Sequence, residues 1–185
     1  MSNDSSDTNE PSPPDTDPTV QSGLAELFET TKTANLGSVS AQGIPSASYA
    51  PYIMDEAGNF YIYISALAKH TANIKRSLKT SFMLIEDEAQ ASSLFARKRV
   101  TWDCEVEPIE RDGEEFNVRI SDFEETFGDI MNTLANMTDF SLFRLKPCNG
   151  VLVLGFGQAF RLSGHEINQH LQGRHSSGHK IKKSS

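Results

Sequence analysis

The segment Phe60–Ser65 is covered by apolar or aromatic side chains on both of its faces. Successive side chains of an extended strand point to opposite faces, so the two sets separate cleanly. One face carries Phe60, Ile62 and Ile64, and the other carries Tyr61 and Tyr63. A strand without a polar face must be covered on both sides. This segment therefore predicts a barrel or a subunit interface.

Seven further segments carry strand patterns, and turn signals separate several of them. The expected strands are Leu36–Ala41, Ser46–Met54, Ser81–Glu86, Arg99–Glu107, Phe140–Lys146, Val151–Leu154 and Gln158–Leu162. Turns are expected at Gln42-Gly43, Ala57–Asn59, Pro147–Gly150 and Gly155–Gly157. Pro108 is expected to end its strand, because proline cannot donate to a strand ladder.

The spacing of apolar residues predicts one long amphipathic helix, Glu114–Met137, with an acidic face toward solvent. Shorter helices are expected at Gln21–Lys32, Lys69–Leu78, Asp87–Phe95 and Gly164–Leu171. Strands and helices together predict a mostly β protein with small helices, arranged as a small antiparallel barrel.

The two ends of the chain differ in composition from its body. Residues 1–20 hold five acidic residues, no basic residue and four prolines, which predicts a disordered acidic arm. Residues 173–185 are polar and contain histidine and glycine, which predicts a flexible C-terminal tail. The barrel domain is therefore expected over residues 21–172.

The net charge of −8 comes mostly from the acidic arm, so the body is only mildly acidic. A nucleic-acid protein needs a basic face over its domain, and we expect no such partner. No apolar run approaches the ~20 residues of a membrane helix, and residues 1–20 lack the pattern of a secretory signal. Two distant cysteines, Cys104 and Cys148, fit a reducing compartment, so we expect a soluble cytoplasmic protein.

Four of the five histidines lie in the last 21 residues, namely His165, His170, His175 and His179. They are either incidental residues of a solvated tail or metal ligands, since neutral imidazole is the commonest ligand of protein-bound metals. No cysteines or dense carboxylates accompany them, so a zinc site is not favoured. A single histidine is enough for an iron that a porphyrin already holds.

Three other places have both a structural and a functional interpretation. Asp139 is either a turn residue or the acceptor for the second N–H of a ligating histidine. The run Arg97–Arg99 is either an exposed turn or a set of partners for carboxylates. His70, with Lys69 and Thr71, either only begins a short helix or helps to bind a phosphate.

Four stretches, in this order, resemble the haem-utilisation proteins of the HutZ and HugZ type. They are Ser48–Pro51, Leu94–Arg99, Phe140–Leu145 and Leu154–Phe160, followed by a terminal Gly178-His179-Lys180. That family is a branch of the pyridoxamine-phosphate-oxidase-like, FMN-binding split barrels. The resemblance implies a homodimeric split barrel with haem bound at the dimer interface.

The resemblance also implies roles for single residues. His179 matches the axial ligand of the haem iron, and Asp139 of the other subunit matches the residue that bonds to that histidine. Arg99 matches an arginine near the haem, and His70 matches a site histidine with a less defined role. His175, four residues before His179, competes for the place of ligand.

The activity that the resemblance implies is oxidative opening of the haem ring with release of iron, with Asp139 and Arg99 as catalytic residues. Haem is then both cofactor and substrate, and the sequence does not identify the electron donor. One alternative is a flavin-dependent oxidoreductase that binds the phosphate of FMN near Lys69–Arg76. A non-catalytic haem store or carrier is a second alternative, and a barrel without a cofactor is a third.

Overall fold

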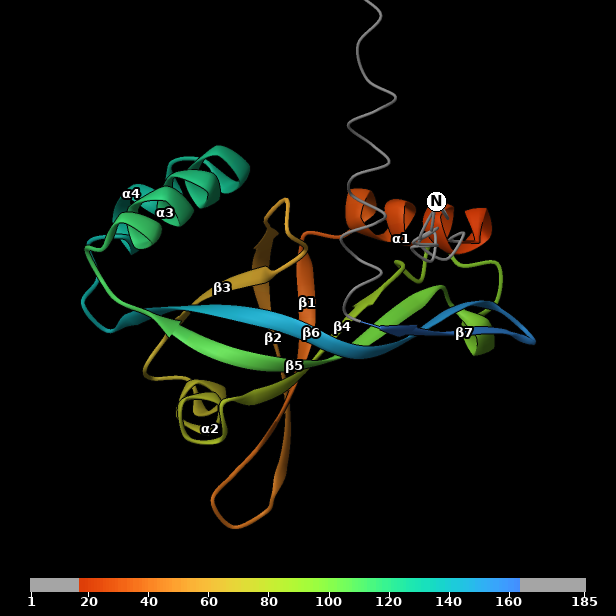
Figure 1. The fold of residues 1–185 in the computed structure, drawn as a ribbon, viewed down its shortest axis with the longest axis horizontal. Helices are drawn as coiled ribbons and strands as arrows, with labels where there is room; N and C mark the ends of the chain where they lie inside the picture. Colours follow the sequence, from red (N-terminus) through yellow and green to blue (C-terminus); the bar gives the residue numbers. More distant parts are fainter. Residues whose placement is uncertain (1–16, 164–185) are drawn as a thin grey trace, which may run out of the picture.

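The structure, a computed structural model, describes residues 17–163, and Figure 1 shows its fold. Its strands are β1 (Thr33–Val39), β2 (Pro45–Met54), β3 (Phe60–Ser65), β4 (Lys79–Ile85), β5 (Arg99–Ile109), β6 (Phe140–Gly155) and β7 (Gln158–Ser163). Its helices are α1 (Pro18–Thr30), α2 (Lys69–Ser77), α3 (Glu114–Phe127) and α4 (Ile130–Leu134), with a short 3-10 helix η1 (Leu94–Ala96). The predicted class, mostly β with small helices, is confirmed.

Six antiparallel strands close into a barrel. They follow the order β3-β2-β1-β4-β5-β6, and β6 returns to pair with β3. The closing pairs run from Phe60 opposite Leu145 to Ser65 opposite Phe140. Closure gives each of these strands a neighbour on both sides, which removes the unpaired backbone groups of an edge. The predicted antiparallel barrel is therefore confirmed.

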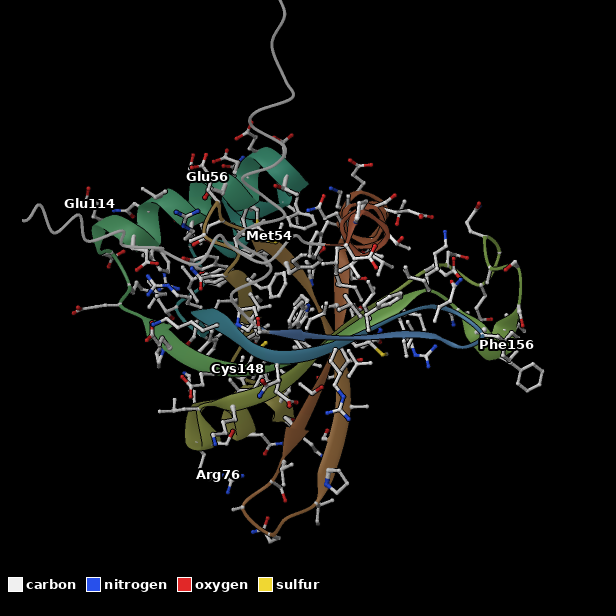
Figure 2. All side chains as sticks on the ribbon, turned by 45° about the vertical axis from the view of Figure 1, so that its right-hand side comes forward. Met54, Glu56, Arg76, Glu114, Cys148 and Phe156 are labelled. Atoms are coloured by element: carbon white, nitrogen blue, oxygen red, sulfur yellow. The ribbon has the colours of Figure 1, made fainter. Side chains whose placement is uncertain are left out.

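Strand β6 belongs to two parts of the fold. Its first half, from Phe140 to Leu145, pairs with β3 in the barrel, and its second half pairs with β7 outside the barrel. Strand β5 pairs with β6 along almost its whole length. At the corner between β6 and β7, Phe156 projects into solvent with 74% of its surface exposed (Figure 2).

The turn predicted at Pro147–Gly150 is wrong, because β6 runs through it. The register with β5 shifts by one residue between Asp103 and Cys104, which leaves Cys148 as the extra residue of a β-bulge. Pro108 also lies inside β5 and not at its end, opposite Phe143. Proline is tolerated there because the pairing of β5 with β4 already stops at Glu105, so no neighbour on that side needs its N–H.

The two faces of β3 are covered by different parts of the molecule, as its sequence pattern predicts. Phe60, Ile62 and Ile64 lie in the barrel core, where the Phe60 ring stacks on Phe82 at a centroid distance of 4.2 Å. Tyr61 and Tyr63 lie in a second cluster under α3 and α4. Each fully buried large side chain contributes about 1.5–3 kcal/mol to this packing.

The second cluster explains why α3 and α4 lie at one end of the barrel (Figure 1). Phe116 and Phe123 of α3 and Met131 of α4 are buried against the tyrosine face of β3. The single long helix predicted over this region is divided, because Gly128 has a φ of 75°. A glycine adopts a positive φ without steric cost, so the helical conformation ends there and α3 stops at Phe127.

Two other helix predictions need correction. The first helix begins at Pro18 and not at Gln21, because the Asp17 side chain accepts a hydrogen bond from Thr19 N at 2.8 Å and caps it. Residues 18–20 therefore belong to α1 and not to the predicted arm. The helix predicted over Asp87–Phe95 is wrong; that segment contains turns and only the start of η1, because it lacks a repeating apolar face.

The rest of the predicted arm, the helix Gly164–Leu171 and the tail 173–185 lie outside the described residues. Within residues 17–163, no helix combines the length and the apolar character that crossing a membrane requires.

Candidate functional site

Asp139 lies in the turn between α4 and β6, and its side chain is exposed. Its Oδ2 accepts a hydrogen bond from Ser65 Oγ at 2.7 Å, and its carbonyl accepts one from Ala66 N at 2.7 Å. Among residues 17–163, no donor reaches its Oδ1. One carboxylate oxygen is therefore fixed to the end of β3, and the other is open to an external donor.

His70 lies in the first turn of α2, close in sequence to the same end of β3. Burial lowers the pKa of its imidazole below the usual value of 6.5, so the ring is neutral at pH 7. The next residue, Thr71, donates its hydroxyl to Ser65 O at 2.6 Å. Ser65 thus links the turn that carries His70 to the carboxylate of Asp139, and the structure brings these two candidate residues to one end of the barrel.

The residues on which the flavin alternative depends do not converge at the start of α2. The Thr71 hydroxyl is engaged by Ser65 O, and the α2 N-cap residue Ala68 offers no side-chain hydrogen bond. Arg76, labelled in Figure 2, lies near the other end of α2 and donates to Val39 O. Two polar groups of the region on which the flavin alternative depends, the Thr71 hydroxyl and the Arg76 guanidinium, are therefore already engaged within the protein.

The basic run before β5 is not uniform. Arg97 forms an ion pair with Glu88 at 3.0 Å, and Lys98 forms one with Glu26 at 2.7 Å. Arg99 donates from Nη1 to Arg97 O at 3.0 Å and has no carboxylate partner among residues 17–163. Of the three cations, Arg99 is the one that this part of the chain leaves available to an anionic ligand.

The structure does not bring Arg99 and Asp139 together within one protomer. Arg99 begins β5 and lies opposite Val153 near the far end of β6, whereas Asp139 directly precedes the first residue of β6. At about 3.3 Å per residue, roughly 40 Å of strand separates the two positions. The register therefore puts them at opposite ends of the long β5–β6 pair, which Figure 1 shows crossing the molecule.

The outer face of the barrel carries a row of uncharged side chains between these two ends. The strand registers place them side by side across β2, β1, β4, β5 and β6 as Tyr49, Asn35, Met83, Thr101 and Val151. Tyr49 and Val151 are 69% and 45% exposed. Depletion of charged side chains is a feature of the cores of protein–protein interfaces.

Arg111 and Tyr63, which sequence reasoning missed, hold the chain on both sides of Asp139. The guanidinium of Arg111 donates to Ala135 O at 3.1 Å, Met137 O at 2.7 Å, Phe140 O at 3.1 Å and Tyr63 Oη at 3.0 Å. The Tyr63 hydroxyl in turn donates to Leu134 O at 3.2 Å. The alternation of β3 signals that Tyr63 is buried, but no sequence signal marks Arg111, which follows β5 in an ordinary turn.

The two histidines that compete as iron ligand, His175 and His179, lie outside the described residues. Among residues 17–163, no three histidine, cysteine or acidic side chains gather as a metal site would require.

Comparison with known proteins gives one family and several relatives. The family model described as pyridoxamine 5′-phosphate oxidase matches residues 21–152. The heme oxygenase HutZ of Vibrio cholerae is 42% identical over 144 residues, which cover 78% of this chain and 81% of that protein.

Solved structures resemble the fold described above. The crystal structure of HutZ from Vibrio cholerae, described as a heme storage protein, matches with a TM-score of 0.68 and 38% identity, over 71% of this chain and 93% of that one. ChuZ of Campylobacter jejuni matches with a TM-score of 0.72 and 34% identity, over 78% of this chain and 59% of that one. A heme binding protein of Mycobacterium smegmatis, at 21% identity and a TM-score of 0.71, shares the fold over 82% of this chain and 60% of its own.

Proposed function

The chain belongs to the pyridoxamine 5′-phosphate oxidase family, and we propose that it is a homodimeric haem-degrading enzyme that opens the haem ring oxidatively and releases iron. The observation that carries this proposal is the 42% identity to a heme oxygenase over 78% of the chain. Bound haem would supply the iron at which the oxidant reacts. The oxidant is either oxygen, together with electrons from an external donor, or peroxide. The protein's part is to bind, orient and shield this substrate.

The residues of the chain divide these tasks. His179 binds the iron, and the open Oδ1 of Asp139 from the other subunit accepts the second N–H of that imidazole, which makes the ring a stronger donor. Arg99, without a carboxylate partner among residues 17–163, orients the haem through its positive charge. His70, neutral at pH 7, lies on the Asp139 side of the site.

The dimer is part of this proposal because one protomer keeps Arg99 and Asp139 at opposite ends of β6. A two-fold partner packed on the uncharged outer row, from Tyr49 to Val151, would bring the Arg99 end of one subunit toward the Asp139 end of the other. A second protomer therefore supplies the residue that the first one lacks.

The test is reconstitution of the purified protein with haemin, followed by a reductant in air. We expect loss of the Soret band together with iron release, and we expect His179→Ala to abolish both while His175→Ala retains them. Haemin with reductant but without protein measures the background reaction. If only His175→Ala alters the haem spectrum, the ligand is His175 and the assignment of His179 is wrong.

Haem storage is a second candidate, favoured by the description of the Vibrio cholerae HutZ crystal structure as a heme storage protein. It predicts tight haem binding and a Soret band that persists through repeated addition of reductant in air. A flavin enzyme predicts instead a yellow purified protein, although Thr71 and Arg76 of α2 are engaged elsewhere. The colour of the protein before haem addition and the fate of the Soret band afterwards separate the three functions.

A further inference from the structure

The guanidinium of Arg111 lies between the end of α4 and the start of β6 and has no carboxylate partner among residues 17–163. Its acceptors are three backbone carbonyls and the Tyr63 hydroxyl, and its charged centre lies 5.1 Å from the Phe116 ring centroid. The positive charge of Arg111 therefore interacts with backbone carbonyl dipoles and with the face of an aromatic ring. Charge-assisted hydrogen bonds of this kind are stronger than neutral ones.

These carbonyls lie on both sides of Asp139. Met137 is two residues before it and Phe140 is one residue after it, and a single nitrogen, Nη2, donates to both carbonyls. The planar, rigid fork of an arginine fixes such acceptors relative to one another, which a lysine on a flexible stem does less well. The turn Thr138-Asp139 therefore has its two ends tied to one side chain.

The remaining freedom of the turn is removed from the other side. Ala66 N binds the carbonyl of Asp139, and Ser65 Oγ binds its Oδ2. With both flanks, its own carbonyl and one carboxylate oxygen held, Asp139 presents Oδ1 in a single direction. A hydrogen bond to a ligating imidazole needs this direction to be set before the ligand arrives.

We propose that Arg111 is the positioning residue for the Asp139 carboxylate. This inference rests on the proposed function, because Asp139 acts there on His179 of the partner subunit. The described contacts of Arg111 are with backbone carbonyls, the Tyr63 hydroxyl and the Phe116 ring, and none is with the Asp139 carboxylate. It acts by holding the chain at Met137 and Phe140, so its removal affects the imidazole only through Asp139.

The test uses the full-length protein reconstituted with haem in the ferrous state. Resonance Raman spectroscopy measures the iron–histidine stretching frequency, which falls when the imidazole loses its carboxylate acceptor. We expect Asp139→Asn to lower this frequency, Arg111→Met to lower it in the same direction, and Arg111→Lys to give an intermediate value. The double variant Arg111→Met/Asp139→Asn is expected to match Asp139→Asn alone.

Arg119→Met is the matched control, because Arg119 also lies over an aromatic ring, 4.9 Å from the Tyr61 centroid, but makes no contact with the turn. It should leave the frequency at the wild-type value. Amide hydrogen exchange of the haem-free protein is the second measurement, and it applies also to a variant that binds haem poorly. Amide hydrogen exchange of Ala66, whose N–H donates to Asp139 O at 2.7 Å, should be roughly tenfold faster in Arg111→Met than in Arg119→Met, with Arg111→Lys between the two.

The outcomes separate this inference from the proposed function. If Asp139→Asn lowers the frequency while both Arg111 variants keep the wild-type frequency and exchange rate, the positioning role is wrong and the proposed function stands. If the double variant shifts well beyond Asp139→Asn, Arg111 acts by another route and the inference is also wrong. If the wild-type protein binds no haem, the proposed function fails and the inference fails with it.

Discussion

The Oγ of Ser65 lies 2.7 Å from Oδ2 of Asp139, so the last residue of β3 holds a carboxylate that directly precedes β6. The two strands already meet here, since Ser65 lies opposite Phe140 in the pairing that closes the barrel. The strand pair that closes the barrel therefore also orients the Asp139 carboxylate of the candidate site.

Ser65→Ala removes the donor to Asp139 and the acceptor for Leu67 N. We expect the free energy of unfolding to fall by about 1 kcal/mol, and haem to bind several-fold more weakly because Asp139 is less well oriented. Urea unfolding and haem titration measure the two effects. Ser40→Ala is the control, since the Ser40 hydroxyl likewise makes two hydrogen bonds in an exposed turn, both of them accepted from backbone N–H groups. A haem titration like that of the wild type would contradict the prediction.

Val151→Glu places a charge in the uncharged outer row of the barrel. If this row packs against a second copy, the buried carboxylate should raise the dimer dissociation constant at least about tenfold, because an unpaired charge is costly to bury. Sedimentation equilibrium measures the constant. Val118→Glu on α3 is the matched control, since Val118 is 47% exposed and Val151 is 45% exposed. Equal dissociation constants for both variants would place the dimer contact elsewhere.

The His70 imidazole has a pKa lowered by burial, so the folded protein binds this proton more weakly than the unfolded chain. Stability from this group is complete above the ordinary value of 6.5 and falls as the pH drops below it. Wild-type protein should therefore lose more stability than His70→Gln between pH 7.5 and 5.5. Urea midpoints at both pH values measure the difference, and parallel changes in the two proteins would disprove it.

Gly150 lies opposite Trp102, and a Cβ at this position would lie 2.4 Å from Trp102 Cε3. The indole is fully buried and cannot move aside, so Gly150→Ala should lower the free energy of unfolding by about 1–3 kcal/mol. Gly155→Ala is the control on the same strand, because its Cβ would meet its nearest neighbour at an ordinary 3.4 Å. Equal unfolding midpoints for the two variants would contradict the prediction and show that Trp102 can shift to accommodate the added Cβ.

The Glu107 carboxylate accepts hydrogen bonds from Lys146 and Arg144, and these lower its pKa below 4.5. Its contribution to stability is present above pH 4.5 and is lost as the pH falls through the lower, folded-state value. The difference in unfolding free energy between wild type and Glu107→Gln should therefore shrink below pH 4.5. Glu105→Gln, two residues earlier on the same strand, is the control, because no ion pair joins Glu105 to a basic side chain among residues 17–163. Acid unfolding curves of the three proteins decide the point.

Local patterns in the sequence predicted much of the barrel. The strand Phe60–Ser65 and its two faces are confirmed residue by residue, because alternation reflects burial on each side of a strand. The pairing of β3 with β6 was not predictable in this way, since it joins residues about 80 positions apart and depends on the whole ring. The break at Gly128 shows a further limit, because apolar spacing continues across a residue that ends the helix.

The candidate site was less accessible from local patterns. Asp139, Arg99 and His70 were selected through resemblance to a family, and their roles stay predictions. The structure adds that Arg97 and Lys98 are engaged by acidic residues whereas Arg99 is not. Arg111 escaped notice because its acceptors lie 24 to 48 residues away in the chain. Only the folded chain brings them to one guanidinium.

The bulge at Cys148 also determines which residue numbers face the core along β6. Before the bulge the odd-numbered Phe143 and Leu145 point into the barrel, and after it the even-numbered Leu152 does. The inward-facing residues therefore change from odd to even numbers once along β6, at the surplus residue Cys148. In a chain lacking Cys148, inward-facing and outward-facing residues would alternate without interruption along β6, and the same side chains would still face inward. The strand can therefore lose one residue at this point while Leu152 still faces the core.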